Sequence, residues 1–189
     1  MSPLYKKKGS RFDVLSYRPI SHLPLLGKLL EKMIAHKLSF YVETKLTNKQ
    51  HGFRRHRSCM TAVAVLSDKI TRAIYRKNNL CGAVFVDLRR AFDYVNSFML
   101  LDTLHSDSNV DSNLLRLLNS YFTNRHYSIK LGDYTDPACN FNSACPQGSV
   151  LAPLLFSVFI NDLSAKLPFD HIVFTDDLIF FTDTTNISL

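Results

Sequence analysis

Two adjacent aspartates, Asp176 and Asp177, stand between two short apolar runs in the 189-residue sequence. The runs, residues 171–174 and 178–181, are rich in β-branched and aromatic residues, so the stretch predicts a strand, a tight turn and a second strand. Because Asp is common in turns, a solvated turn is one explanation of the pair. Neighbouring carboxylates repel each other unless a cation lies between them. Their oxygen atoms would suit Mg²⁺, which is the second explanation.

A third carboxylate, Asp87, comes at the end of the apolar run from Cys81 to Leu88. A run of this kind is consistent with a strand that is buried on both faces. A charge at the end of a buried strand is costly unless it is paired or bound to a metal. If this strand shares a sheet with the hairpin, Asp87 lies beside Asp176 and Asp177. Three such carboxylates can hold two divalent ions for in-line displacement at phosphorus, a chemistry open to polymerases and nucleases alike.

Charge is unevenly distributed along the chain, whose net charge is +7. Residues 1–60 contain 13 Lys and Arg against 3 Asp and Glu, whereas residues 61–189 contain 10 against 13. This asymmetry predicts one part that contacts polyanions and another that needs carboxylates. An ordinary solvated basic surface is the alternative.

The cysteines and the apolar runs predict the environment of the protein. The four cysteines form no C-x-x-C pair, which argues against zinc and against a disulfide framework and fits a reducing compartment. The basic N-terminus shows no signal peptide. The longest apolar run, Val150 to Ile160, is too short to span a bilayer. We therefore expect an intracellular protein that is neither secreted nor membrane-bound, in the nucleus or the cytoplasm.

Hydrophobic periodicity predicts a mixed helix and strand chain. Helices are expected over residues 25–42, over 62–74 with an end at Asn78-Asn79, over 91–105 and 111–124, and from an N-cap at Ser149 to residue 163. Residues 17–20 are expected to be extended because a proline follows Arg18. Further short strands are expected over residues 127–132 and 139–144.

Six segments resemble motifs of the reverse transcriptases of jockey-type non-LTR retrotransposons, and their order along the chain and their spacing agree with that family. The resemblance extends from about Pro3 to Phe181, nearly the whole chain. The first catalytic motif of that family resembles residues 81–95, CGAVFVDLRRAFDYV. The other segments are residues 17–21 (YRPIS), 52–54 (GFR), 144–156 (ACPQGSVLAPLLF), 160–163 (INDL) and 174–177 (FTDD).

The resemblance implies an α+β fold, the fingers and palm of a right-hand polymerase, with a small antiparallel palm sheet backed by helices. Residues 1–80 would form a fingers-like basic region and residues 81–189 a palm-like catalytic region, with part of 125–148 returning to the fingers. The later palm motif and the thumb have no counterpart. We therefore expect a truncated copy or a fragment of a longer polyprotein.

The resemblance also implies a set of metal-binding residues. Asp87 and Asp176 would be the principal ligands of two Mg²⁺ ions, with Asp177 as the third carboxylate and Mn²⁺ as a possible replacement for Mg²⁺. Thr175 departs from the family, which usually has Ala there. Because a branched side chain suits a strand, we expect this replacement to be tolerated.

Substrate contacts are implied for five further residues. Gln147 and Gly148 would line the nucleotide and template pocket, where backbone close to a substrate favours Gly. Phe92 would abut the sugar and exclude a ribose hydroxyl, although on pattern alone it is a core aromatic residue. Arg18 is the best candidate for the triphosphate, with Arg54 a weaker one, since guanidinium groups match phosphate oxygens.

Lys8 is another weak candidate for the triphosphate. Four more basic residues are explained equally well as solvated or ion-paired charges and as contacts with the template backbone: Lys6, Lys7, Arg55 and Arg57.

The implied function is RNA-directed DNA synthesis, in which dNTPs are added to a DNA primer on an RNA template. One alternative is a catalytically inactive relic that acts at most as a basic nucleic-acid-binding module. Another is an RNA-dependent RNA polymerase, which Phe92 disfavours. The oligomeric state is not indicated by the sequence.

Overall fold

A computed structural model of the chain describes residues 1–75, 80–88, 91–140 and 145–184. The chain divides into two compact units, each built from two separate segments. The first unit comprises residues 1–42 and 92–156, and the second comprises residues 43–91 and 157–189. This division differs from the predicted boundary at residue 80, which concerned functional subdomains and stays a prediction.

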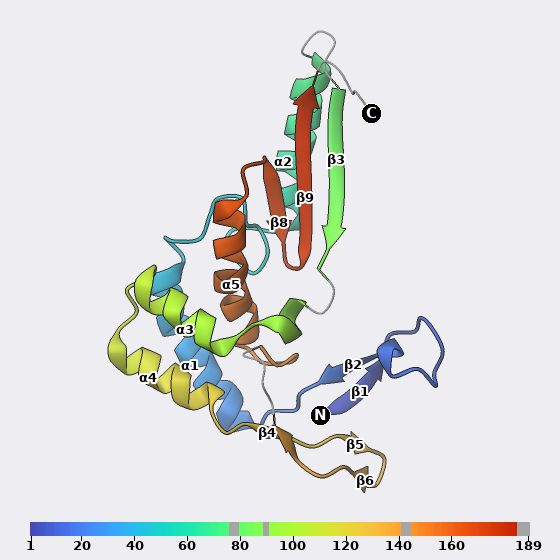
Figure 1. Cartoon of the computed structure of the whole chain (residues 1–189), viewed down its shortest axis with the longest axis vertical. Helices are drawn as coiled ribbons and strands as arrows, with labels where there is room; N and C mark the ends of the chain where they lie inside the picture. Colours follow the sequence, from blue (N-terminus) through green and yellow to red (C-terminus); the bar gives the residue numbers. More distant parts are fainter. Residues whose placement is uncertain (76–79, 89–90, 141–144, 185–189) are drawn as a thin grey trace. The chain divides into compact units, whose positions relative to one another are not determined.

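An antiparallel sheet of three strands, in the order β3-β9-β8, forms the centre of the second unit (Figure 1). The strands are β3 (Leu80–Asp87), β8 (His171–Phe174) and β9 (Asp177–Thr184). Strands β8 and β9 form the predicted hairpin, and β3 pairs with β9 along its whole length. The strand order therefore confirms that the chain around Asp87 shares a sheet with the Asp176-Asp177 hairpin.

Helix α2 (Cys59–Tyr75) covers one face of this sheet (Figure 1). Its Ala62 packs into a buried cluster with Ile172 of β8 and Phe181 of β9. On the same unit, the hydroxyl of Ser164 lies 2.8 Å from Nε2 of the buried His171. A small apolar core and one buried polar contact thus hold the sheet.

Strand β3 is not buried on both faces, so that prediction was wrong. Val84 is 61% exposed and its neighbour Phe85, which points to the opposite face, is 69% exposed. In the described part of the chain β3 pairs only with β9, which makes it an edge strand. Apolar content alone does not distinguish an edge strand from a central one. Asp87 is exposed as well, so burial is not the reason for it to need a partner.

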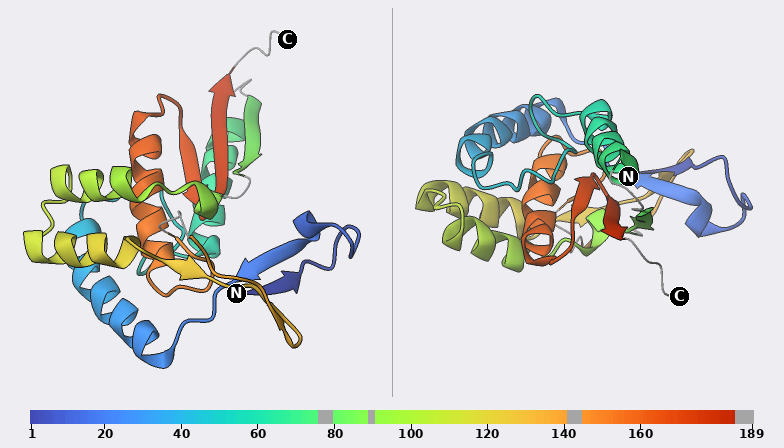
Figure 2. Two further views of the ribbon diagram at one scale, coloured as in Figure 1. Left: turned by 60° about the horizontal axis from the view of Figure 1, so that its bottom comes forward. Right: turned by 90° about the horizontal axis from the view of Figure 1, so that it is seen from above.

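Helices α1 (Leu25–Val42), α3 (Ser97–Ser106) and α4 (Ser112–Phe122) lie in the first unit, with α3 and α4 side by side (Figures 1 and 2). The helices predicted over 25–42 and 111–124 are confirmed. The one predicted over 91–105 is divided, because a 3₁₀ turn, η2 (Ala91–Tyr94), precedes α3. The side chain of Asn96 caps α3 by accepting hydrogen bonds from the amides of Phe98 and Met99 at 2.9 and 3.2 Å.

Helix α5 (Ala152–Lys166) begins three residues later than the predicted N-cap. The hydroxyl of Ser149 nevertheless accepts hydrogen bonds from the amides of Leu151 and Ala152 at 3.1 and 3.2 Å. Ser149 therefore satisfies amides at the start of α5 without being its cap residue.

Short antiparallel ribbons complete the first unit, and a 3₁₀ turn, η1 (Val14–Ser16), precedes β2. The pairs are β1 (Ser2–Tyr5) with β2 (Tyr17–Ile20), β4 (His126–Tyr127) with β7 (Cys139–Asn140), and β5 (Lys130–Leu131) with β6 (Tyr134–Thr135). The extended stretch at residues 17–20 is confirmed, and the strand predicted over 127–132 is divided in two. The predicted helix end at Asn78-Asn79 and residues 141–144 of the other predicted strand lie outside the described residues.

Within the described part of the chain, every helix is too short or too polar to reach across a lipid bilayer.

The cysteines should differ sharply in reactivity. Cys145 has 0% exposed surface, and burial raises the pKa of its thiol to about 12, whereas Cys59 and Cys139 are exposed. Because the thiolate is the reactive form, iodoacetamide at pH 8 should label Cys59 and Cys139 in the native chain and leave Cys145 unlabelled. Mass spectrometry after digestion checks this, with the denatured chain as the control in which all cysteines react. Labelling of Cys145 at the rate of Cys59 would contradict the structure.

Candidate active site

The three predicted carboxylates meet at one end of the sheet in the second unit. Asp87, the last residue of β3, is the direct cross-strand partner of Asp177, the first residue of β9. Directly opposed residues of antiparallel strands project from the same face. Phe174 pairs with Asp177 across the hairpin, which leaves Thr175 and Asp176 as the two turn residues. Two aspartates on neighbouring strands and a third in the turn between strands therefore share this end of the sheet.

Backbone contacts tie the end of β3 to the turn. The amide of Leu88, the residue after Asp87, donates to the carbonyl oxygen of Asp176 at 3.1 Å. The hydroxyl of Thr175 donates to Oδ1 of Asp176 at 2.8 Å. The carboxylates thus sit on backbone that is held by its own hydrogen bonds.

The carboxylates influence one another electrostatically. The pKa of Asp177 is raised above its ordinary value, chiefly by burial and then by the negative charges of Asp176 and Asp87. A raised pKa means that the charged form is disfavoured. A cation placed among the three groups would relieve this repulsion.

The donor chemistry of this cluster fits a divalent metal, although a complete metal site is not formed. Carboxylate oxygens are the ligands that Mg²⁺ prefers, and Asp87, Asp176 and Asp177 could supply them. Among the described residues, however, no group of three or more His, Cys, Asp or Glu side chains is arranged to hold a metal ion. The structure therefore brings the carboxylates together at the level of the backbone and leaves their convergence on an ion as a prediction.

Thr175 occupies a backbone conformation that the sequence reasoning did not anticipate. Its φ of +56° lies in the left-handed region, and it is a turn residue rather than a strand residue. The expectation that its branched side chain suits a strand was therefore wrong. This conformation costs a β-branched residue about 1–2 kcal/mol, and the first position of such hairpin turns usually carries Gly. The turn that carries Asp176 is consequently strained.

The segment around Gly52 supports the strained turn from the side. Gln50 forms a parallel bridge with Val173 of β8, and the amide of His51 donates to the carbonyl of Val173 at 2.8 Å. A Cβ atom on Gly52 would lie 2.3 Å from the backbone nitrogen of Thr175. Only glycine fits in this contact. Sequence reasoning noted the motif at 52–54 but not this role, because the two partners are 123 positions apart.

The ring of His51 anchors the same segment to α2. Its Nδ1 lies 2.9 Å from the hydroxyl of Thr61, and the side chain is buried. Burial lowers the pKa of His51, and the positive charges of Arg57 and Arg54 lower it further. A neutral imidazole is therefore the favoured form beside the turn.

Arg54, a predicted substrate contact, is engaged within the second unit. Its side chain is 7% exposed and pairs with Glu43 at 2.9 Å. Its Nη1 also donates to the carbonyl oxygen of Thr47 at 2.7 Å. These contacts give Arg54 a structural role, and a triphosphate contact through it stays a prediction. Arg57 likewise binds the carbonyl oxygen of Gln50, at 3.2 Å.

The remaining predicted contacts belong to the first unit, where two of them meet the end of β2. Arg18 is exposed on β2. The carbonyl oxygen of Gln147 accepts a hydrogen bond from the amide of Ser21 at 2.8 Å. Gly148 has φ +97°, and a Cβ atom there would lie 2.8 Å from the carbonyl oxygen of Ser21. The positive φ and the close contact with Ser21 thus explain why residue 148 is glycine, without reference to a substrate.

Phe92 stacks on Phe156 within the first unit, with ring centroids 4.3 Å apart and an interplanar angle of 19°. This agrees with the reading of Phe92 as a packing residue. Its predicted contact with the sugar stays a prediction.

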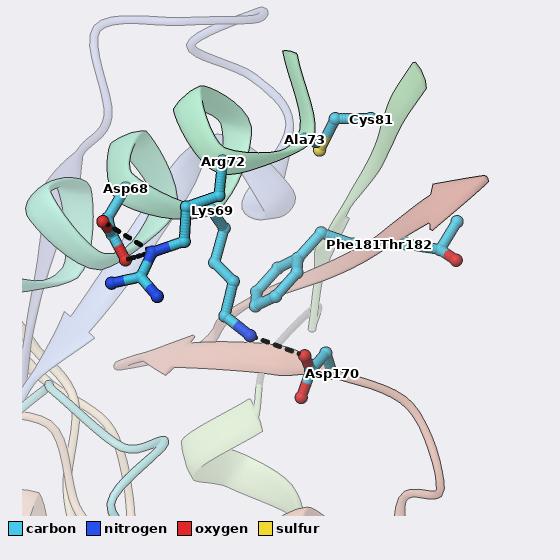
Figure 3. Close-up of a pocket in the computed structure, with 8 residues that line it drawn as sticks. All are labelled: Asp68, Lys69, Arg72, Ala73, Cys81, Asp170, Phe181 and Thr182. Atoms are coloured by element: carbon cyan, nitrogen blue, oxygen red, sulfur yellow. Dashed lines mark hydrogen bonds and ion pairs between the residues drawn. The ribbon is translucent and has the colours of Figure 1, made fainter. Parts of the chain in front are cut away.

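A pocket of about 350 Å³ lies elsewhere on the second unit, between α2, β3, β9 and the residue before β8 (Figure 3). Its charges are paired, Lys69 with Asp170 and Arg72 with Asp68, each at 2.8 Å. Thr182 of the pocket is five residues along β9 from Asp177, or about 17 Å at the usual rise per residue. The pocket is therefore not part of the carboxylate cluster.

The fold of the chain has a counterpart among solved structures. It is similar to the telomerase of Candida albicans, solved in complex with a TWJ fragment of telomeric RNA, with a TM-score of 0.53 and 15% sequence identity. The match covers 82% of this chain and 30% of the telomerase chain. At this identity the likeness concerns the fold alone, and it agrees with the predicted α+β fold of polymerase fingers and palm.

The sequence comparisons go further than the fold. Residues 5–188 match the family described as reverse transcriptase (RNA-dependent DNA polymerase), so this chain belongs to the reverse transcriptase family. It is 36% identical over 151 residues to a probable RNA-directed DNA polymerase from transposon BS of Drosophila melanogaster. It is 32% and 31% identical to the RNA-directed DNA polymerases from mobile element jockey of Drosophila funebris and Drosophila melanogaster. The predicted resemblance to the jockey type is thereby confirmed.

The chain is much shorter than these relatives. The three matches cover 78%, 80% and 93% of this chain but only 16%, 16% and 19% of the relatives. The chain therefore spans less than a fifth of the length of the relatives it matches.

Replacing Gly52 by Ala should displace the turn that carries Asp176. The added methyl group would overlap the backbone of Thr175, which cannot move as a flexible side chain could. We expect Gly52→Ala to lower the free energy of unfolding by about 1–3 kcal/mol, as other overpacked sites do. Urea denaturation followed by circular dichroism measures this.

Gly27→Ala is the matched control for that experiment. Gly27 lies in α1, and a Cβ atom there would meet only Pro24 at an ordinary 3.7 Å. Since Ala favours helix over Gly, Gly27→Ala should leave stability unchanged or raise it by up to about 1 kcal/mol. Equal effects of the two substitutions would contradict the close contact at Gly52.

Neutralising Asp177 should stabilise the metal-free chain at neutral pH. Its pKa is raised in the folded state, so the folded chain binds a proton more readily there than the unfolded chain, and stability from this group rises as the pH falls through that raised pKa. Asp177→Asn should therefore raise stability at pH 7 by up to about 0.5 kcal/mol, a small value because the group is largely exposed. The gain should vanish below about pH 4.

Urea denaturation in EDTA at several pH values tests this expectation. A variant that is less stable than the parent chain at pH 7 would show that the folded state does not disfavour the charge of Asp177.

Proposed function

We propose that this chain is the fingers and palm portion of an RNA-directed DNA polymerase of a non-LTR retrotransposon. In this role it adds dNTPs to the 3′ end of a DNA primer on an RNA template. The observation that carries the proposal is the cross-strand pairing of Asp87 with Asp177 beside Asp176, in a chain of the reverse transcriptase family.

In the proposed mechanism the second unit holds the metal ions. Asp87 and Asp176 would be the principal ligands and Asp177 the third, for two Mg²⁺ ions that Mn²⁺ could replace. When bound, these ions supply Lewis acidity that activates the primer hydroxyl and offsets charge on the triphosphate. The hydrogen bond from Thr175 to Oδ1 of Asp176 orients that carboxylate, whose oxygens would bind the ions.

The first unit supplies contacts with the substrate. Arg18, exposed on β2, pairs with the triphosphate, and Gln147 and Gly148 line the nucleotide and template pocket. The hydrogen bond between Ser21 and Gln147 supports this grouping, because it joins the strand of Arg18 to the Gln147-Gly148 segment. Phe92 abuts the sugar and selects dNTPs over NTPs.

A second candidate function is RNA binding without catalysis. The excess of 13 basic over 3 acidic residues within residues 1–60 favours it. It predicts binding of RNA that weakens steeply with salt, and no primer extension even with all three carboxylates intact.

Replacing Asp176 by Asn should abolish incorporation of dNTPs on a primed RNA template. The substitution keeps the size of the side chain and removes the charge that a metal ligand needs, so we expect a loss of at least about 100-fold. The measurement is extension of a labelled primer in Mg²⁺, by this chain and by a longer polypeptide that continues into a thumb.

Asp68→Asn is the control for that assay. Asp68 is a carboxylate of the same unit that pairs with Arg72 on the surface of α2 at 2.8 Å. It should retain full incorporation. Incorporation that survives Asp176→Asn would contradict the proposed mechanism, and salt-sensitive RNA binding without extension by the parent proteins would favour the second candidate.

A further inference from the structure

A buried carboxylate in the first unit has no part in the proposed mechanism. Glu31 of α1 is 1% exposed. A carboxylate in such surroundings is costly unless hydrogen bonds compensate its lost hydration. The hydrogen-bond partners of Glu31 therefore indicate which part of the structure the carboxylate stabilises.

Two donors from distant parts of the chain bind the two oxygens of Glu31. The amide of Val150 donates to Oε2 at 2.6 Å. The hydroxyl of Tyr121, on α4, donates to Oε1 in a short hydrogen bond. The carboxylate thus joins α1 and α4 to the segment that precedes α5.

Tyr121 is a dependable donor in this arrangement. Its pKa is raised to about 12, first by burial and then by the hydrogen bond to Glu31, so the hydroxyl stays protonated at neutral pH. The guanidinium of Arg125 lies over its ring, 4.5 Å from the centroid. The Tyr121 hydroxyl therefore remains available as a donor to Glu31 near pH 7.

The segment that Glu31 holds is the one that carries Gln147 and Gly148. Val150 lies two positions after Gly148. The carbonyl oxygen of Gln147 accepts a hydrogen bond from the amide of Ser21 at 2.8 Å. The segment is therefore anchored on both sides, by Ser21 before Gly148 and by Glu31 after it. Between the two anchors, Gly148 adopts its positive φ of +97°.

We propose that Glu31 is a positioning residue for the nucleotide and template pocket. Its carboxylate holds the backbone of residues 147–150 so that Gln147 and Gly148 face the incoming nucleotide in one arrangement. This inference rests on the proposed function and extends it to a residue that touches no substrate. It differs from a packing role, because packing alone would be met by an apolar side chain of similar size.

Two substitutions at Glu31 separate positioning from packing. A Gln side chain can keep both contacts, since its amide oxygen can accept from Val150 and its amide nitrogen can donate to the hydroxyl oxygen of Tyr121. A Leu side chain fills similar space but accepts no hydrogen bond, and the amide of Val150 loses its partner. Tyr121→Phe removes one donor and leaves the carboxylate, so it serves if Glu31→Leu does not fold.

The first readout is hydrogen exchange at the Val150 amide, measured by NMR in the 189-residue chain. We expect Glu31→Leu to accelerate this exchange roughly tenfold or more, because the amide loses its acceptor, and Glu31→Gln to change it only a few fold, because a neutral hydrogen bond replaces the charged one. Lys32→Leu, an exposed neighbour on α1, is the control and should leave the exchange unchanged.

The second readout is the split between KM and kcat for dNTP in primer extension. Glu31→Leu should raise KM for dNTP roughly ten- to a hundredfold, with kcat and primer–template affinity within about twofold of the parent. Glu31→Gln should restore KM to within a few fold, and Tyr121→Phe should give an intermediate value. A purely structural role would lower stability and the amount of active protein without this selective change in KM.

The outcomes separate this inference from the proposed function. Unchanged exchange at Val150 in Glu31→Leu, or faster exchange with an unchanged KM, overturns the positioning role. If the parent chain extends no primer in any form, the proposed function fails, and with it the assignment of residues 147–150 to a nucleotide pocket. The exchange at Val150 then still decides whether Glu31 holds the segment, with acceleration supporting the anchor and no change overturning it.

Discussion

The pairing register between β3 and β9 is the constraint on which the candidate site depends. Eight consecutive residue pairs, from Leu80 with Thr184 to Asp87 with Asp177, set this register. Because side chains alternate between the faces of a strand, a shift by one residue would move Asp87 to the opposite face from Asp177. The meeting of the carboxylates is therefore a property of the whole sheet, which the packing of α2 and the two-residue hairpin turn maintain together.

The same end of the sheet carries costs that the rest of the second unit must offset. Thr175 has a positive φ, and the pKa of Asp177 is raised by burial and by its acidic neighbours. Strain and repulsion of this kind persist only where the surrounding structure over-determines the geometry. Here the contact of Gly52 with Thr175 and the bridge between Gln50 and Val173 provide that support. The strained backbone of Thr175 and the repulsion among the carboxylates therefore lie at the end of the sheet where the proposed chemistry requires negative charge.

Local pattern was enough to predict the hairpin and the helices over residues 25–42 and 111–124, because periodicity and turn chemistry act over a few residues. The approach of Asp87 to the hairpin was predicted only on the condition that the two share a sheet, which the pairing of β3 with β9 meets. Local pattern was not enough for β3, whose apolar run reads the same at an edge as at a centre. It also missed Gly52, whose reason for being glycine lies across the chain at Thr175. Glu31 was missed for the same reason, since only the tertiary structure shows that a polar residue in an amphipathic helix is buried.

The charged groups of the chain fall into two kinds, and the difference bears on function. Glu31 and Arg54 are buried, and partners within their own units satisfy them, so their charges are compensated by the protein itself. Within the described part of the chain, by contrast, no Lys, Arg or His forms an ion pair with Asp87, Asp176 or Asp177. Like charges that a sheet register brings together repel one another. Carboxylate oxygens suit a divalent cation, which is the partner that the proposed function assigns to this cluster.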